Sequence, residues 1–175
     1  MSEPQSGSTP KMSLPIPMQW TWKHFNDLSV HDLHDALALR CRVFILEQGP
    51  YQDPDEYDQH AWHLLGRAPQ SEHGNALLAT LRILGPGVKY AEASIGRVAC
   101  APEIRGLGFG RQMVAEGIAQ SGRIFPGVPI RISAQAHLQR MYGELGFSTV
   151  SEEYLEDDIP HVEMLCPAPL GESPR

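Results

Sequence analysis

The chain has 175 residues, the length of one domain with short tails, and its 42% hydrophobic content is enough for a sizeable core. The net charge of −7 argues against a general nucleic-acid binder, which would carry a basic surface. No apolar run reaches the length of a membrane span, and no signal peptide is recognisable at the N-terminus. Three cysteines without metal-site spacing favour a reducing compartment, so we expect a cytoplasmic protein without nucleic-acid or membrane partners.

Both ends of the chain are rich in proline. Residues 1–17 hold four prolines among Ser, Gly and Gln, and residues 167–175 hold three more. Such segments bury too little apolar surface to offset the entropy lost on ordering. We therefore expect flexible tails at 1–17 and 167–175 and one folded domain over 18–166.

Hydrophobic periodicity predicts an α/β fold in the order β-α-β-β-β-α-β-α-β-β. A capping-box pattern at Ser29 and Asp32 predicts the start of a first helix that runs to about Leu46. Further helices are predicted at 108–121 and 137–145. The predicted strands lie at 19–25, 60–66, 76–84, 93–100, 129–134, 147–154 and 161–165. This order predicts a mixed, mostly antiparallel sheet of about seven strands with flanking helices.

An acidic segment at 47–58 separates the first helix from the second strand. It carries Glu47, Tyr51, Asp53, Asp55 and Asp58. These groups could line a pocket and attract a cation, or they could form a solvated loop. A metal site made by Asp58, His60 and His63 is not expected, because alternate faces of a strand would hold the two histidines apart.

A glycine-rich loop follows the strand at 93–100. Gly106, Gly108 and Gly110 precede or begin a helix, and Arg105 and Arg111 flank them. The first N–H groups of a helix lack intrahelical partners and attract anions, so the pattern predicts a pyrophosphate site. The alternative is a purely structural turn.

The spacing excludes two common phosphate loops. No Gly-x-x-x-x-Gly-Lys-Ser/Thr run exists, and Gly-x-Gly-x-x-Gly fails because Arg111 or Met113 occupies the third glycine position. What remains is Arg-Gly-x-Gly-x-Gly after a Val-x-Cys-x-Pro strand end. This resembles the coenzyme-A-binding signature of the GNAT superfamily of N-acetyltransferases.

Three further segments narrow the resemblance to the ElaA-like subgroup. They are 39–51 (LRCRVFILEQGPY), 95–98 (IGRV) and 134–147 (AQAHLQRMYGELGF). One departure is visible, since Gly49 stands where the subgroup usually has Cys after Glu-Gln. The resemblance implies a GNAT acetyltransferase domain over 18–166, with a cofactor cleft between splayed fourth and fifth strands.

The resemblance also implies acetyl-CoA as cosubstrate and no metal. The residues it assigns to the cofactor are Val98, Ala99, Cys100, Arg105, Gly106, Leu107, Gly108, Phe109, Gly110, Arg111 and Gln135. Gln135 matches a pantetheine-binding position, although it could be an ordinary polar strand end. Cys100 is interpreted as a small buried residue, which favours direct transfer without an acyl-enzyme.

The resemblance also implies that Tyr142 is the general acid, because it lies in the Tyr-x-x-x-Gly-Phe run where the superfamily often has that residue. A phenol is protonated at neutral pH and can donate to a departing thiolate. The alternative is that it only packs beside Phe147. The general base is less well defined. Glu47 is the residue we assign, and Asp58, His63 and His137 are the other candidates.

The leading interpretation is an acetyl-CoA-dependent N-acetyltransferase acting on the amine of a small molecule, peptide or protein. The alternative is a non-catalytic CoA-binding or sensory module with the same fold. The sequence leaves the oligomeric state open, with a dimer among the possibilities.

Overall fold

A computed structural model describes residues 17–49 and 52–168 of the chain. Nearly all of the two predicted tails therefore lies outside the described residues. The elements are β1 (Gln19–His24), α1 (Val30–Arg40), β2 (Ala61–Arg67), β3 (Leu77–Leu84), β4 (Ala93–Cys100), α2 (Phe109–Ile124), β5 (Ile130–Gln135), α3 (Gln139–Gly143), β6 (Ser148–Thr149), β7 (Tyr154–Glu156) and β8 (Ile159–Cys166).

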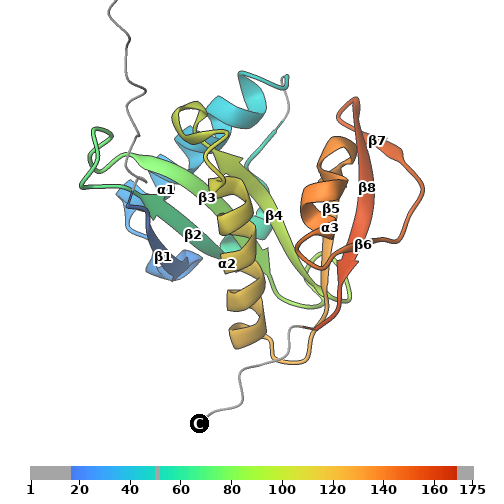
Figure 1. Cartoon of the computed structure of the whole chain (residues 1–175). Coiled ribbons are helices and arrows are strands. Elements are labelled where there is room, and N and C mark those ends of the chain that lie inside the picture. The colour runs from blue at the N-terminus through green and yellow to red at the C-terminus, as the bar shows by residue number, and fades with distance from the viewer. Residues whose placement is uncertain (1–16, 50–51, 169–175) are drawn as a thin grey trace, which may run out of the picture.

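The strands form one open sheet of eight strands in the order β1-β2-β3-β4-β5-β8-β6, with β7 paired to β8 (Figure 1). Among the strand pairs of the described residues, β4 and β5 are parallel and the others antiparallel. The predicted mixed, mostly antiparallel α/β sheet is confirmed.

The first helix begins where the sequence predicts. Ser29 Oγ accepts from the Asp32 N–H, and the Asp32 carboxylate accepts from the Ser29 N–H, which completes the capping box. After Arg40 the helix continues as a π-helical turn at Cys41–Ile45, in which the Leu46 N–H donates to the Cys41 carbonyl. This turn brings Val43 and Phe44 to the cavity described below.

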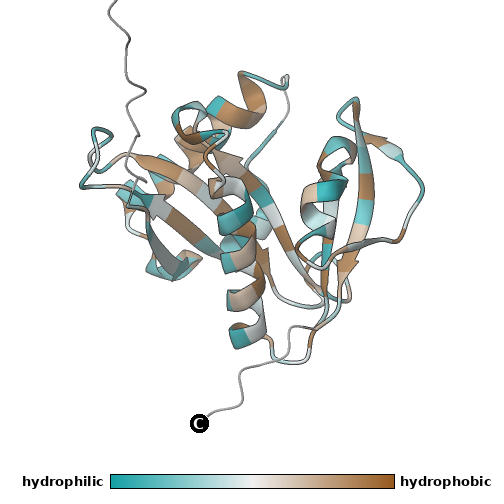
Figure 2. Cartoon of the chain, in the orientation of Figure 1, coloured by the Kyte–Doolittle hydropathy of each residue, from teal (hydrophilic) through white to brown (hydrophobic). Residues whose placement is uncertain are grey.

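The core is one hydrophobic cluster that packs the helices against the sheet and includes residues of both β1–β4 and β5–β8. Every residue of β3 is buried, and Figure 2 shows β2 and β3 as largely apolar. Helix α2 packs closely on this surface at Gly117, where an added Cβ would lie 3.1 Å from Ile95 Cδ1 and 3.3 Å from Leu81 Cδ2. The close approach holds the middle of α2 against β3 and β4.

The C-terminal strands differ from the prediction. The prediction of a single sixth strand over 147–154 is wrong, because the chain forms two short strands there, β6 and β7, with a bend between them. At the bend, Ser151 Oγ accepts from the Glu163 N–H, while the Val150 N–H donates to the Glu163 carbonyl. A side chain thus takes the place of one ladder bond. β7 then pairs with β8 through a two-residue turn at Asp157 and Asp158, both with positive φ.

No helix in the described ranges is both long enough and apolar enough to cross a membrane.

Candidate active site

The sheet opens between β4 and β5. The two strands pair only at Ala93–Ile130 and Ser94–Arg131, and then diverge (Figure 1). A cavity of about 500 Å³ lies at this opening. Its walls come from the later parts of β4 and β5, from the end of the π-helical turn, and from the β7–β8 hairpin. The cleft predicted between the fourth and fifth strands is therefore present.

A β-bulge shapes the β4 wall. Thr80 pairs with Ala99 but Arg82 pairs with Gly96, so Arg97 and Val98 together face one residue of β3. Arg97 has φ 52°, and its side chain turns toward the segment before β2. Bulges leave ladder groups unpaired and re-aim side chains. This one lies where Val98 lines the cavity.

Tyr51 lies outside the described residues, but the aspartates of the acidic segment form neither a solvated loop nor an open cation site. Its aspartates belong to an Asp–Arg network, made of Arg40, Arg82, Arg97, Asp53, Asp55 and Asp58. Asp53 is 1% exposed and Asp58 5%. Burial alone would raise the pKa of Asp58, but hydrogen bonds and charges from Arg40 and Arg82 lower it to about 2. The carboxylates are thus already neutralised by arginines.

The general-base candidates named from the sequence do not line the cavity. They are Glu47, Asp58, His63 and His137, and all four are among the described residues. Glu47 accepts two hydrogen bonds from Arg105, at 2.7 and 2.9 Å, which lower its pKa. His63 is buried, with Nε2 3.1 Å from the Asp58 carbonyl, and burial lowers its pKa. His137 is exposed. Glu47 stays a prediction as the base.

The glycine loop leaves open space before α2. Gly106 and Gly108 have φ 76° and 85°, and a Cβ added to either would meet no atom within 4 Å. No side chain caps the first turn of α2, so its N–H groups are available to an anion. Among these described residues, the loop thus has the room and the donors that a diphosphate needs.

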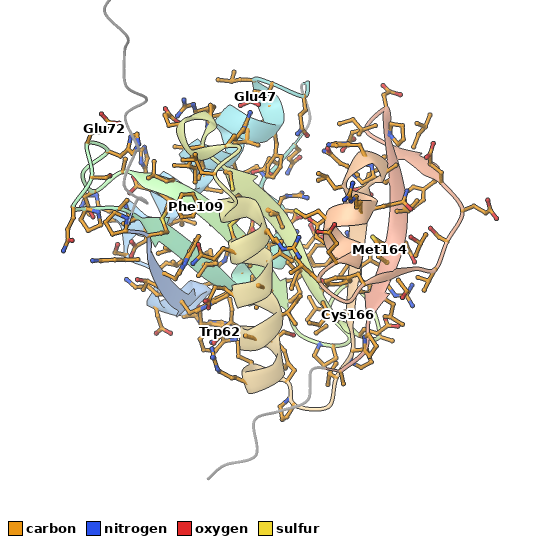
Figure 3. The ribbon with its side chains drawn as sticks, viewed as in Figure 1. Glu47, Trp62, Glu72, Phe109, Met164 and Cys166 are labelled. Atoms are coloured by element: carbon orange, nitrogen blue, oxygen red, sulfur yellow. The ribbon has the colours of Figure 1, made fainter. Side chains whose placement is uncertain are left out.

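The two arginines of the loop already have acidic partners. Arg105 bonds Glu47 and also donates to the Cys100 carbonyl at 3.2 Å. Arg111 pairs with Glu144. Figure 3 shows Glu47 beyond the end of α2 that begins at Phe109. An anion bound in the loop would therefore share these arginines with carboxylates.

Tyr142 lies in the cavity wall and is 6% exposed. Burial, with a smaller contribution from Cys100, raises its pKa to about 12. Its ring also packs edge-on against Phe147, at 5.7 Å between centroids, so the packing contact and the position at the cavity coexist. Burial raises the pKa of Cys100 to about 11. At neutral pH the phenol can therefore donate a proton, and the thiol is a poor nucleophile.

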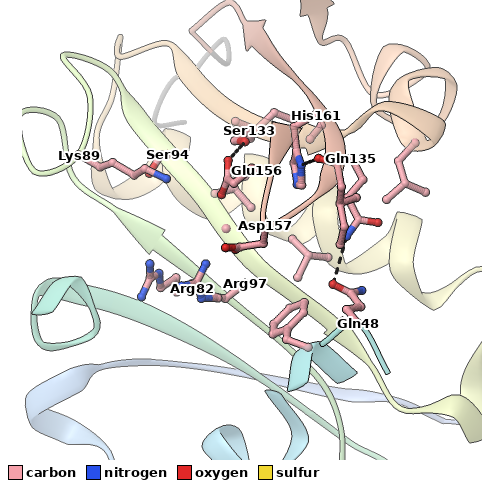
Figure 4. A pocket seen from close by; sticks show the side chains of 18 of the residues that line it. Gln48, Arg82, Lys89, Ser94, Arg97, Ser133, Gln135, Glu156, Asp157 and His161 are labelled. Carbon is pink, nitrogen blue, oxygen red and sulfur yellow. Dashed lines mark hydrogen bonds between the residues drawn. The ribbon is translucent and has the colours of Figure 1, made fainter. Parts of the chain in front are cut away.

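Gln135 and Val98 also line the cavity, while Ala99 is buried beside them. The Gln135 amide donates to Gln48 Oε1 at 3.3 Å, which joins β5 to the end of the π-helical turn (Figure 4).

Sequence reasoning missed the wall made by β5, β7 and β8. Ser133 Oγ donates to Glu156 Oε2 at 2.7 Å (Figure 4), so the Tyr154 hydroxyl, also 2.7 Å away, is the donor to Ser133. Glu156, Asp157 and Asp158 line the cavity. An Asp-Asp pair between two β-prone runs is a turn signal, and it could have revealed the hairpin.

Comparison with known proteins places this geometry in a family. Residues 63–167 match the model of the acetyltransferase (GNAT) domain. The chain belongs to the GNAT acetyltransferase family. A UPF0039 protein of Synechocystis is 42% identical over 153 residues, which cover 87% of this chain and 97% of that protein. The ElaA protein of Escherichia coli is 37% identical over 150 residues, covering 84% and 95%.

Two solved structures share the GNAT fold at similar identity. An acyl-CoA N-acyltransferase from Pseudomonas aeruginosa is 40% identical with a TM-score of 0.79, covering 85% of this chain and 99% of that one. The crystal structure of E. coli ElaA is 36% identical with a TM-score of 0.77, at the same coverage. The resemblance to the ElaA-like subgroup is confirmed.

Proposed function

We propose that this GNAT protein is an acetyl-CoA-dependent N-acetyltransferase that moves the acetyl group directly to an amine of a small molecule, peptide or protein. The observation that carries the proposal is the cavity between the diverging strands β4 and β5, with the buried and neutral Tyr142 in its wall. This arrangement can align a thioester with an amine beside a proton donor.

The glycine loop would hold the cosubstrate. The N–H groups of residues 106–111 would bind the pyrophosphate, with Arg105 and Arg111 adding positive charge. The backbone of Val98, Ala99 and Cys100 and the amide of Gln135 would bind the pantetheine arm. The bound thioester supplies the activated acetyl group. Tyr142 would protonate the departing thiolate.

The acceptor end of the cavity supports a cationic amine. Glu156, Asp157 and Asp158 line the cavity, and their carboxylates favour an ammonium group by Coulomb attraction. Cys100 has a raised pKa, and Gly49 removes a further thiol, so nothing in these two positions supports an acyl-enzyme. We therefore assign a single direct transfer.

Calorimetric titration with acetyl-CoA, with NAD as the control ligand, tests the cosubstrate site. We expect micromolar acetyl-CoA binding, no NAD binding, and loss of binding in Gly108→Glu, because the new carboxylate fills the loop with like charge. Gly127→Glu is the matched control, since Gly127 also has positive φ (78°) and open space but lies beyond the far end of α2. Unchanged acetyl-CoA affinity in Gly108→Glu would overturn the assignment.

Turnover is tested on 1,4-diaminobutane, spermidine and a lysine peptide, by release of free CoA thiol. Tyr142→Phe should lower kcat about 10²-fold or more while leaving the acetyl-CoA Kd unchanged, since a general acid contributes about 10²–10⁴-fold. Acetyl-CoA binding without turnover of any amine would favour the alternative, a non-catalytic CoA-binding module.

A further inference from the structure

His161 lies in the wall of the cavity, on β8. In the strand register it is opposite Gln135 of β5 on one side and Tyr154 of β7 on the other. Gln135 is one of the residues proposed to bind the pantetheine arm. His161 therefore lies on the strand next to a residue proposed to bind the cosubstrate, and Figure 4 shows both side chains at the cavity.

One hydrogen bond fixes the tautomer of His161. Its Nδ1 lies 2.8 Å from the Ile159 carbonyl oxygen. A carbonyl only accepts, so Nδ1 carries the hydrogen and Nε2 of the neutral ring holds a free lone pair. The ring also stacks on Tyr154, with centroids 6.2 Å apart and planes at 27°. In the described part of the chain, Nε2 has no hydrogen-bond partner.

His161 shares the cavity with carboxylates and with cationic side chains. The charged or titratable side chains that line the cavity with it are Arg82, Lys89, Tyr90, Arg97, Tyr142, Glu156, Asp157 and Asp158, and its ring stacks on Tyr154. The carboxylate of Glu156 is oriented by Ser133, which itself accepts from Tyr154. The carboxylates of the β7–β8 hairpin attract a cationic acceptor. The base candidates chosen from the sequence do not line the cavity as His161 does.

We propose that Nε2 of His161 is the general base that takes the proton of the acceptor amine, an inference that rests on the proposed function. The acceptor ammonium gives one proton to Nε2, and the freed nitrogen lone pair forms a C–N bond with the acetyl carbonyl carbon. The C–S bond breaks with its electron pair on sulfur, and Tyr142 protonates the thiolate. After the C–N bond forms, the acceptor nitrogen still carries one proton too many, and this proton passes through solvent to the Tyr142 phenolate. His161 then releases the proton that it took to water.

Kinetics of His161→Gln test the role, with the best acceptor of the amine panel. We expect kcat/KM to fall about 10²-fold or more while the affinity for acetyl-CoA stays unchanged. We also expect the fall of kcat/KM at low pH to disappear from the pH profile. His161→Ala should regain rate with added imidazole. His31→Gln, which alters an exposed histidine on α1, is the control and should match the wild type. Wild-type rate and pH profile in His161→Gln would overturn the base while leaving the proposed function intact. No wild-type turnover would overturn both.

A second measurement does not depend on activity. In the ligand-free protein labelled with ¹⁵N-histidine, the signals lost in His161→Gln identify this ring. We expect the neutral form to be protonated on Nδ1, because the Ile159 carbonyl holds that hydrogen. An Nε2-protonated ring would occupy the lone pair that the reaction requires, and would overturn the assignment.

Discussion

Replacing Arg40 by Met tests whether the Asp–Arg network holds the acidic segment in place. The Arg40 side chain is 2% exposed, with Nε 2.9 Å from Asp53 Oδ2 and a terminal nitrogen 2.7 Å from Asp58 Oδ1. Met fills much of the same volume but leaves both carboxylates with one fewer cation in a buried setting. Removing one partner of a buried ion pair typically costs about 3–5 kcal/mol.

The pKa of Asp58 gives an independent magnitude. Its fall from 3.8 to about 2 corresponds to roughly 2 kcal/mol of preference for the ionised form, shared between Arg40 and Arg82. Because this pKa is lower in the folded state, the contribution is complete above the unfolded value and is lost as pH falls from 3.8 through about 2. The Arg40→Met deficit should therefore be largest at neutral pH and shrink toward pH 2.

Urea unfolding at pH 7 and at pH 3 measures both effects. We expect the free energy of unfolding to fall by about 3–5 kcal/mol at pH 7, and Tm to fall by about 6–20 °C. Arg42→Met is the matched control on the same helical segment, because Arg42 and Glu103 form an exposed pair worth about 0–1 kcal/mol. Equal losses in the two variants, or a loss under about 1 kcal/mol in Arg40→Met, would refute the reasoning.

Three smaller changes follow from other sites. Asp158→Gly should raise the free energy of unfolding by about 1 kcal/mol, since φ 62° suits glycine; unchanged urea stability would contradict this. Glu47→Gln should tighten acetyl-CoA binding in calorimetry by releasing Arg105 to the pyrophosphate, whereas weaker binding would count against that role. Iodoacetamide at pH 7.5 should label the exposed Cys41 before Cys100, whose pKa is about 11; peptide mass spectrometry showing the reverse would refute the burial argument.

Local patterns were sufficient for the glycine loop and the first helix. The positive φ values at Gly106 and Gly108 and the capping box at Ser29 depend on neighbouring residues, so a short stretch of sequence carries the whole signal. The order of strands and helices along the chain was likewise predictable as far as α3, because hydrophobic periodicity distinguishes strands from helices. The sixth strand was wrong because a single side chain, Ser151, replaces a ladder bond, and no periodicity records such an exchange.

Long-range pairings could not be predicted. Arg82 meets Asp55 and Asp58 across 27 and 24 residues, and only the folded chain decides which arginine neutralises which carboxylate. For this reason the sequence left a cation site in the acidic segment as one possible interpretation. His161 was missed for the same reason, since its place beside Gln135 depends on the register of β5 and β8, and a one-residue shift would turn it to the other face.

The ladder between β4 and β5 is short. Strands β1–β4 carry α2 and strands β5–β8 carry α3, yet only two ladder pairs join β4 to β5, at 93–94 and 130–131, beside side-chain contacts such as Gln135–Gln48 and Arg111–Glu144. A small rotation about this ladder would change the width of the cavity and leave the ladders within β1–β4 and within β5–β8 intact. Amide hydrogen exchange at the junction would thus report on opening between the halves at a lower free energy than exchange within β3, whose residues are buried throughout.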